Sequence, residues 1–250
     1  MNKISLILNT AIGLQDVDHL KTSSFFNEKA KHFLKDKITF DDFKKAINDF
    51  YNNNDENTYY EEADKVSIRI AELLLSNEFE FSIDYYLKIH SFLFKGLVKH
   101  PGSIRKYNFI KNEKVLKLDS VSYADFREIR DLLLFDFKEE KLFDYLGLSI
   151  GEKINHLAVF IGNLWQIHIF EEGNTRTTAV FLIKYLEYLG FEFKYDAFVH
   201  HSHYFRDALV RANYSSIINE VEENKNFLIL FLHNLILGEQ NKLESSDLII

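Results

Sequence analysis

Apolar residues recur at intervals of three and four along most of the chain, and this spacing predicts helices. One such pattern carries Val66, Ile70, Leu73 and Leu74. The other predicted helices span residues 26–34, 40–51, 82–97, 125–137, 152–168, 174–190, 201–215 and 227–237. We expect the charged run Lys138–Lys141 to form a solvated turn after one of them. The pattern therefore favours an all-α protein.

One stretch, from about residue 102 to 122, lacks the helical period. His100-Pro-Gly102 ends the helix before it, because proline and glycine interrupt helical structure. Within the stretch, Lys114–Leu118 and Ser120–Tyr123 are expected to be two short strands. The sequence therefore predicts a single β-hairpin, within about residues 108–123, in an otherwise helical chain.

The first 60 residues are expected to form an N-terminal helical extension. Thr39 and Asp42 have the spacing of a capping box at the start of its second helix. The polar run Asn52–Asn57 is the best candidate linker in the chain. Residues 61–240 then form the main domain, and residues 241–250 form a polar tail that frays. Exposed Phe and Tyr side chains on the N-terminal helices would suit a homodimer.

Composition narrows the classes of function. The chain has 250 residues, is 46% hydrophobic and has a net charge of −8 without a basic run, so it is globular and nucleic acid is not an expected partner. It has no cysteine, which excludes disulfides and thiol catalysis and fits a reducing compartment. No apolar stretch approaches the length of a membrane span, and the short apolar start does not fit a signal peptide. We expect a cytoplasmic protein without membrane association.

The segment His168-Ile-Phe-Glu-Glu-Gly-Asn-Thr-Arg176 concentrates the chemistry of the chain. His168 falls at the end of one predicted helix, and Asn174 is a suitable N-cap for the next. The amides of the loop and of the new helix therefore converge on one point, where they can bind an anion. The same nine residues supply a base, carboxylates for a divalent metal and a phosphate-binding arginine.

This segment resembles the signature of the Fic family, H-x-F-x-[DE]-G-N-[GK]-R-x-x-R. The matching residues are His168, Phe170, Glu172, Gly173, Asn174 and Arg176. Three further segments, 102–108, 114–121 and 208–213, resemble parts of the family that flank the signature. The resemblance extends over roughly residues 82–240 and implies the helical Fic fold with a β-hairpin flap.

Fic proteins usually transfer AMP from ATP to a hydroxyl group of a target protein, with Mg²⁺ as cofactor. The resemblance implies that His168 is the general base toward a Ser, Thr or Tyr hydroxyl, and that Glu172 binds the Mg²⁺. The implied phosphate ligands are Gly173, Asn174, Thr175, Arg176 and Thr177. The acceptor would be an unidentified target protein or the enzyme itself.

Two departures from the signature affect that assignment. Thr175 stands where the family has Gly or Lys, and Ala179 stands where it has a second phosphate-binding arginine. Arg206 and Arg211 are the candidate replacements, and we assign Arg211 to the nucleotide site. A degenerate Fic fold that binds nucleotide or a protein partner without catalysis is the alternative function. Retention of His168 favours the enzyme, because a binding module does not need a base.

The family's flap and its inhibitory helix give two further expectations. Lys114, Val115, Leu116 and Lys117 would dock the target segment as an added strand, the alternative being an ordinary surface hairpin. The family's inhibitory motif, [ST]-x-x-x-E-[GN], does not occur in the chain. Residues 10–20, which include Asp16 and Asp18, resemble a degenerate form of an N-terminal inhibitory segment. We therefore expect deletion of residues 1–20 to change activity little. His90, on an apolar helix face, is interpreted as a core histidine.

Overall fold

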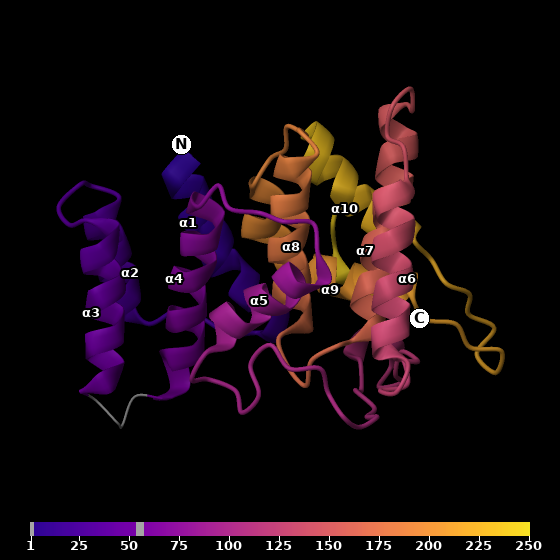
Figure 1. Cartoon of the computed structure of the whole chain (residues 1–250), viewed down its shortest axis with the longest axis horizontal. Coiled ribbons are helices and arrows are strands. Elements are labelled where there is room, and N and C mark those ends of the chain that lie inside the picture. The colour runs from indigo at the N-terminus through magenta and orange to yellow at the C-terminus, as the bar shows by residue number, and fades with distance from the viewer. Residues whose placement is uncertain (1–2, 54–57) are drawn as a thin grey trace.

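The computed structural model describes residues 3–53 and 58–250, and within these ranges every regular element is a helix (Figure 1). The α-helices are α1 (Lys3–Gly13), α2 (Ser24–Phe33), α3 (Phe40–Asn52), α4 (Glu61–Leu75), α5 (Ile83–Phe94), α6 (Ile129–Leu142), α7 (Ile150–Ile167), α8 (Asn174–Tyr188), α9 (Asp196–Ala212) and α10 (Asn226–Leu237). Short 3₁₀ helices are η1 (Leu14–Asp18), η2 (Thr58–Tyr60), η3 (Lys114–Leu116) and η4 (Ser245–Leu248). The predicted all-α class is confirmed. Most of the predicted linker, residues 54–57, lies outside the described residues.

Helix α8 lies at the centre of the molecule and carries the second half of the motif. All of its residues from Asn174 to Leu186 are buried, the polar residues of its first turn as well as the apolar residues Ala179–Ile183 that follow. It packs against α4, α5 and α7. Even Lys184 is buried, and its ammonium group lies 3.6 Å from a carboxylate oxygen of Glu187. The start of α8 is therefore held in place by the whole core.

The predicted cap at Thr39 is present, whereas the predicted N-cap at Asn174 is wrong: Gly173 holds the N-cap position of α8, and the Asn174 side chain bonds the Phe170 backbone instead. Thr39 and Asp42 form a reciprocal capping box at the start of α3, as predicted, and Ser149 and Glu152 form another at the start of α7. Ser82 caps α5 by accepting a hydrogen bond from the amide of Tyr85. These side chains satisfy amides that the first helical turn leaves free, so they fix where each helix begins.

Helix α1 was not predicted and lies in the core between α4 and α9. Ile7, Leu8 and Ala11 are buried there. At Gly13 the backbone of α9 is so close that an added Cβ would lie 2.6 Å from the carbonyl oxygen of Phe198. The apolar run of this segment is short and is interrupted by Asn9 and Thr10, so the helix was missed.

Helices α2 and α3 form the left end of the molecule in Figure 1 and pack against α4. Asp64 of α4 ties them to the main body, because Ser23 and Tyr51 both donate side-chain hydrogen bonds to its carboxylate, at 2.5 and 2.6 Å. Burial of Asp64 raises its pKa. The aromatic residues of these helices mostly pack on one another, as Phe25 and Phe50 do with ring centroids 4.3 Å apart.

The predicted β-hairpin is wrong. Residues Lys114–Leu116 form η3, and the turn that follows places Lys117 and Leu118 at positive φ, 50° and 74°. Val115 and Leu116 are both buried, which neighbouring residues of a one-sided strand cannot be, because their side chains point to opposite faces. Because the side chains of both Val115 and Leu116 are buried, the segment forms a turn that packs on the core and not a paired strand.

The ends of α6 also differ from the prediction. The helix begins at Ile129 rather than 125, and it continues to Leu142, so Lys138–Lys141 is helical and not a turn. The charged residues of that run lie mostly on its solvated face, while Glu140 is buried. In the described part of the chain no helix is both long enough and apolar enough to cross a membrane.

Candidate functional site

The motif loop, residues 168–174, joins α7 to α8. It begins with His168 and ends with Gly173, both in the left-handed conformation, at φ 50° and 75°. The Asn174 side chain closes the loop, since its Oδ1 accepts from the Phe170 amide at 3.0 Å and its Nδ2 donates to the Phe170 carbonyl at 2.8 Å. Phe170 is fully buried, as expected of an anchor. The loop is therefore a small, closed ring fixed at its centre.

The side chain of His168 lies in an aromatic cage. Its ring centroid is 4.0 Å from that of Tyr123, 5.3 Å from Trp165 and 5.5 Å from Phe109. Its Nδ1 atom has no hydrogen-bond partner among the described residues. Burial, and then the positive charges of Lys111, Arg105 and Arg206, lower the pKa of His168 well below its usual value. The imidazole is thus neutral at pH 7 and able to accept a proton.

Arg105 holds the backbone at the end of α7 and at His168. The sequence did not single it out, although it lies in residues 102–108, one of the segments that resemble the family. Its Nε donates to the His168 carbonyl at 2.7 Å, and its Nη2 donates to the Ile167 carbonyl at 3.3 Å. A cation at the C-terminus of a helix stabilises the carbonyl groups that the helix leaves free. Arg105 therefore caps α7 and fixes the backbone of His168.

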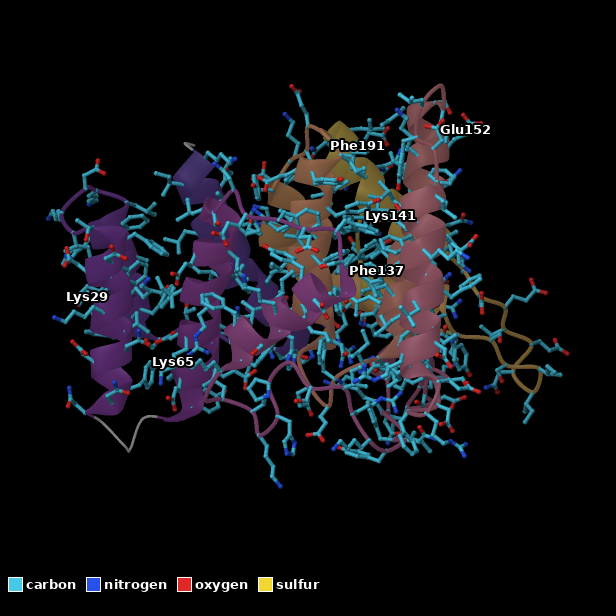
Figure 2. The ribbon with its side chains drawn as sticks, in the orientation of Figure 1. Lys29, Lys65, Phe137, Lys141, Glu152 and Phe191 are labelled. Atoms are coloured by element: carbon cyan, nitrogen blue, oxygen red, sulfur yellow. The ribbon has the colours of Figure 1, made fainter. Side chains whose placement is uncertain are left out.

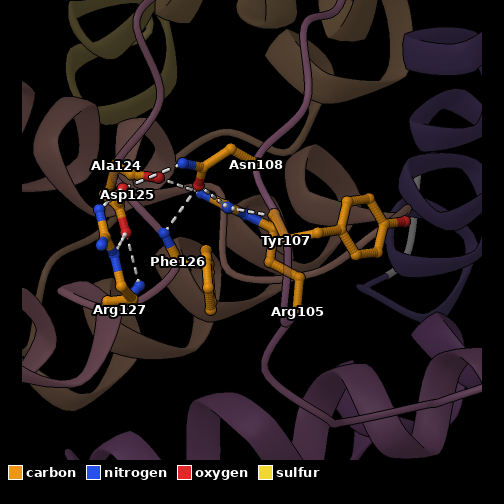
Figure 3. A network of polar contacts seen from close by, with 7 residues as sticks. All are labelled: Arg105, Tyr107, Asn108, Ala124, Asp125, Phe126 and Arg127. Atoms are coloured by element: carbon orange, nitrogen blue, oxygen red, sulfur yellow. Dashed lines mark hydrogen bonds and ion pairs between the residues drawn. The ribbon is translucent and has the colours of Figure 1, made fainter.

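The same arginine holds the covering loop, residues 106–124, which lies over His168. Its guanidinium group also donates to the carbonyls of Tyr107 and Ala124 and to Oδ1 of Asn108. Figure 3 shows how Asn108 continues this network, since its Nδ2 donates to Asp125 at 3.0 Å and its Oδ1 accepts from the Phe126 amide at 2.8 Å. Arg105 thus joins the catalytic histidine candidate to both ends of the covering loop.

His90 is buried, as predicted for a core histidine, but it also positions the motif. Its Nδ1 accepts from the Gly102 amide at 2.7 Å, and its Nε2 lies 3.0 Å from the Glu172 carbonyl, to which it donates. Its ring stacks on Phe170 with centroids 3.7 Å apart. Burial lowers the pKa of His90 to about 4. Its position on an apolar stripe indicated the burial but not the bond to the motif.

The motif hydroxyls are already engaged. Thr175 Oγ1 accepts from the indole N–H of Trp165 at 3.0 Å, and Thr177 Oγ1 donates to the Gly173 carbonyl at 2.9 Å. The side chain at Thr175 therefore lies on α7 rather than over the loop. The first amides of α8 have no hydrogen-bond partner within the helix. These backbone groups therefore remain available to bind a phosphate, although the threonine hydroxyls are engaged.

Arg176 is also engaged, by residues distant in sequence. Its Nη2 lies 2.5 Å from Oε1 of Glu62 and 3.0 Å from Oδ2 of Asp18, and its Nη1 donates to Gln15 at 3.1 Å. The guanidinium group also lies over the Phe94 ring, 4.8 Å from its centroid. Two carboxylates thus neutralise the motif arginine. Only its Nε is buried without a partner in the described structure.

These contacts bear on the expected effect of deleting residues 1–20. Asp18, one of the two acidic residues noticed in the sequence, reaches the motif, and Gln15 does so too. The same segment supplies buried core residues, among them Leu8 and Leu14. Deletion would therefore remove part of the core, so a single substitution at Asp18 is the better test of regulation.

The candidate replacement arginines do not join the motif. Arg206 donates to Oε2 of Glu113 at 2.6 Å, so its charge is neutralised within the covering loop. Arg211 lines a separate cavity of about 810 Å³ whose lining includes no motif residue, and its Nε and Nη1 are buried without partners. Ala179 is fully buried in the core. Arg206 is thus close enough for its charge to act on His168 but is paired with Glu113, and Arg211 lines a cavity away from the motif.

The predicted metal and flap residues have contrasting positions. Glu172 is exposed at the tip of the motif loop, where its carboxylate is free to meet a cation. No three His, Asp or Glu side chains gather into a metal site within residues 3–53 and 58–250, so a bound Mg²⁺ would need phosphate oxygens as well. Lys114, Val115, Leu116 and Lys117 lie in and after η3, which packs near α9, and they present no free strand edge.

Comparison with known proteins agrees with this geometry. Residues 80–186 match the model of the Fic/DOC family. The N-terminal Fic domain of Bep8, a VirB-translocated effector of Bartonella sp. 1-1C, has a TM-score of 0.54 and 16% identity, covering 70% of this chain and 82% of that one. The N-terminal Fic domain of a Bep effector from Bartonella sp. AR 15-3, described as a VirB type IV secretion substrate, has a TM-score of 0.54 and 18% identity, covering 77% and 86%. No curated protein matches significantly. Residues 80–186 are therefore similar to the Fic/DOC family, and the chain shares the fold of these Fic domains.

Proposed function

We propose that this protein transfers AMP, or a related nucleotidyl or phosphoryl group, from ATP to a Ser, Thr or Tyr hydroxyl of a protein. One observation carries the proposal: a buried, neutral histidine with an unpartnered nitrogen lies at the head of the closed loop that leads into the free amides of α8. A binding module has no need of a base there, whereas a general base must be neutral before it can take a proton.

The donor set fits ATP and Mg²⁺ in its chemistry. Glu172 would hold the metal through its exposed carboxylate, and the amides of Asn174 and Thr175 would meet phosphate oxygens. Bound Mg²⁺ would supply charge neutralisation on the phosphates. The unpartnered Nε of Arg176 is a further donor available to an anion. Loss of the second arginine at Ala179 leaves the orientation of the terminal phosphate to other groups.

The residues of the chain would act as follows. His168 takes the proton of the incoming hydroxyl, and the hydroxyl oxygen forms a bond to the attacked phosphorus while the bond to the departing phosphate group breaks. Arg105 holds the His168 backbone, so the imidazole does not shift as it gains the proton. Stabilisation of the added charge comes from the α8 amides, which need no reorganisation.

The covering loop must move for this chemistry to occur. Tyr123 and Phe109 lie against His168, and the Glu113–Arg206 ion pair holds the loop over it. Arg176 must likewise exchange at least one carboxylate for phosphate. We propose that the structure corresponds to a closed state of the enzyme, in which both the base and the arginine are covered.

A degenerate Fic fold that binds without catalysis is the second candidate. The specific observation in its favour is the pairing of Arg176 with Asp18 and Glu62, which satisfies the motif arginine without any ligand. In that case the motif would serve to hold the N-terminal segment against α8.

The mass of the intact protein after incubation with ATP and Mg²⁺ distinguishes the two. We expect an AMP-sized increment on the wild type and none on His168→Ala, with exposed His100→Ala as the matched control that keeps the increment. A phosphate-sized increment would mean that a different phosphate is attacked. If no increment forms on the wild type or on a loop-opened Glu113→Gln variant, while ATP still raises the melting temperature, the binding-only function is the correct one.

A further inference from the structure

The loop between α9 and α10, residues 213–225, projects away from the helices and is amber at the right of Figure 1. At its tip Ile217 and Ile218 are 98% and 94% exposed. A single antiparallel bridge between Ser216 and Val221 closes the tip, with backbone hydrogen bonds of 2.8 and 3.0 Å. Two large aliphatic side chains are thus held in water by a structured turn, although their burial would be favourable.

Acidic residues flank the two isoleucines. Glu220 and Glu222 are exposed and have no ion-pair partner among the described residues, whereas Glu223 lies 3.0 Å from the ammonium group of Lys225. The tip, defined as residues 216–223, therefore combines an apolar pair with negative charge. A surface that receives it needs an apolar floor and a basic rim.

Such a surface occurs between α5 and α6. The groove has a volume of about 530 Å³, which is large enough for more than one aliphatic side chain. Its floor is apolar, made by Phe81, Ile83, Leu87, Ile104, Leu133, Leu134 and Phe137. Leu134 is 61% exposed within it. As in the tip, apolar surface is left in water at a site with defined shape.

The rim of the groove is basic on a chain whose net charge is −8. Arg130, Lys138 and Lys141 line it, and Asp84 is its one lining carboxylate. These cations share one side of α6, because Lys138 and Lys141 lie about two and three turns after Arg130, and Figure 2 shows Lys141 beyond Phe137 along the helix. The N-terminus of α5 also lines the groove, and its helix dipole adds partial positive charge there.

We propose that the tip of one copy of this chain docks into the α5–α6 groove of a second copy. The two surfaces match in polarity and charge, and the lining of the groove includes no residue from 213–225 of its own chain. The contact is between different surfaces of the two molecules, so it closes as a reciprocal dimer about a twofold axis or as a ring. The surface is small and partly charged, so the association is weak and sensitive to salt.

Cysteine trapping tests the contact directly, because the chain has no cysteine of its own. Ile217→Cys and Leu134→Cys variants, one isotope-labelled, are mixed under mild oxidation and the mixed disulfide is measured by mass. The control pairs Ile217→Cys with Tyr59→Cys, which is 77% exposed and lies outside both surfaces. We expect on the order of tenfold more mixed disulfide for the first pair, since docking raises the effective concentration of the thiols. An equal yield for both pairs overturns the proposal.

Charge exchange provides an independent test in the uncrosslinked protein. Glu220→Lys with Glu222→Lys, or Lys138→Glu with Lys141→Glu, should each weaken self-association in sedimentation measurements by roughly tenfold or more. The combined variant, with both exchanges, should recover it, whereas impaired folding would not be repaired by a second exchange. A wild type that stays monomeric up to millimolar concentration, or self-association unchanged by all three variants, shows that another surface or another partner is involved and overturns the proposal.

Discussion

The motif loop and the covering loop lie against each other but are built in opposite ways. The motif loop is held by side-chain bonds to its own backbone, such as the two between Asn174 and Phe170. The covering loop has a few backbone bonds of its own, such as that from the Glu113 amide to the Asp119 carbonyl at 2.9 Å, but polar side chains from outside the loop, among them Arg105 and Arg206, attach it to the rest of the protein. The motif loop is therefore closed by its own side chain, whereas the covering loop is attached mainly through polar contacts with other segments.

This difference indicates where motion can occur. Opening the motif loop would expose Phe170 and leave buried amide and carbonyl groups without partners, which is costly. Opening the ends of the covering loop, near Phe109 and Tyr123, exchanges exposed polar contacts such as Asn108–Asp125 for water, whereas Val115 and Leu116 at its centre are buried and resist opening. The motif loop can thus stay assembled while access to it changes. Four measurements test this contrast, from the largest expected effect to the smallest.

Gly173→Ala should be the most damaging single change to the motif loop. Gly173 has φ of +75°, and an added Cβ would lie 2.3 Å from the Phe94 ring. Strain and overpacking together should cost roughly 3 to 5 kcal/mol of unfolding free energy, measured by urea denaturation. Gly96→Ala is the matched control, since Gly96 has the same φ but nothing within 4 Å, and should cost about 1 to 2 kcal/mol. Equal losses would show that Phe94 yields readily and that the loop is not tightly fixed.

Glu113→Gln should loosen the covering loop. The substitution keeps a hydrogen-bond acceptor near Arg206 but removes the buried countercharge, so we expect a loss of roughly 1 to 3 kcal/mol in stability. If the loop limits access, labelling from ATP should rise by about fivefold or more. Glu239→Gln removes a distant exposed carboxylate and should change neither quantity. Reduced labelling with unchanged stability would mean that Glu113 itself takes part in the reaction.

Acidification should destabilise the protein through His90. Its imidazole stays neutral in the fold down to about pH 4, whereas in the unfolded chain it gains a proton near pH 6.5. Stability from this group is therefore complete above pH 6.5 and is lost as pH falls, by about 2 kcal/mol between pH 7.5 and pH 5. Burial of His168 adds in the same direction. A His90→Gln variant should show a shallower pH slope in urea denaturation; an identical slope would contradict the assignment.

Arg127→Ala should have the smallest effect, although Arg127 is prominent in the network of Figure 3. Its guanidinium group pairs with Asp125 at 2.8 Å but is mostly exposed, so water replaces the pair readily. We expect melting temperature and labelling to match the wild type. A clear change in labelling alone would place Arg127 in the docking of the target rather than in the fold.

The sequence predicted the helical fold and the motif loop well, because both depend on residues that are close together in the sequence. Helical periodicity located most of the helices, and the capping box at Thr39 and Asp42 is as predicted. The ordered signature predicted the loop between α7 and α8, including the buried anchor Phe170. Each of these features depends on residues within one or two helical turns, which is the range over which a pattern can be recognised.

The residues that surround the motif could not be predicted, because tertiary contacts bring them there. Asp18 and Glu62 reach Arg176 from positions more than 100 residues away. Arg105 caps α7 through backbone carbonyls, which any sequence would supply. A β-hairpin was wrongly predicted because Val115 and Leu116 resemble a strand by composition, whereas both side chains are buried in a 3₁₀ turn. At these sites tertiary packing, and not the local preference for a secondary structure, determines the conformation.

The position of α1 has a consequence for how the protein is made. Thr10 donates to the carbonyl of Tyr195, a partner 185 residues later in the chain, and Gly13 touches α9 through its backbone. At ribosomal rates of about 5 to 20 residues per second, the first helix waits roughly 10 to 40 seconds for that partner to be synthesised. During that interval the surface of α1 that faces α9 is uncovered, although α4 can already pack against its other side. The nascent chain is therefore expected to depend on chaperones until α9 emerges, and a stall late in translation would release a molecule with an open core.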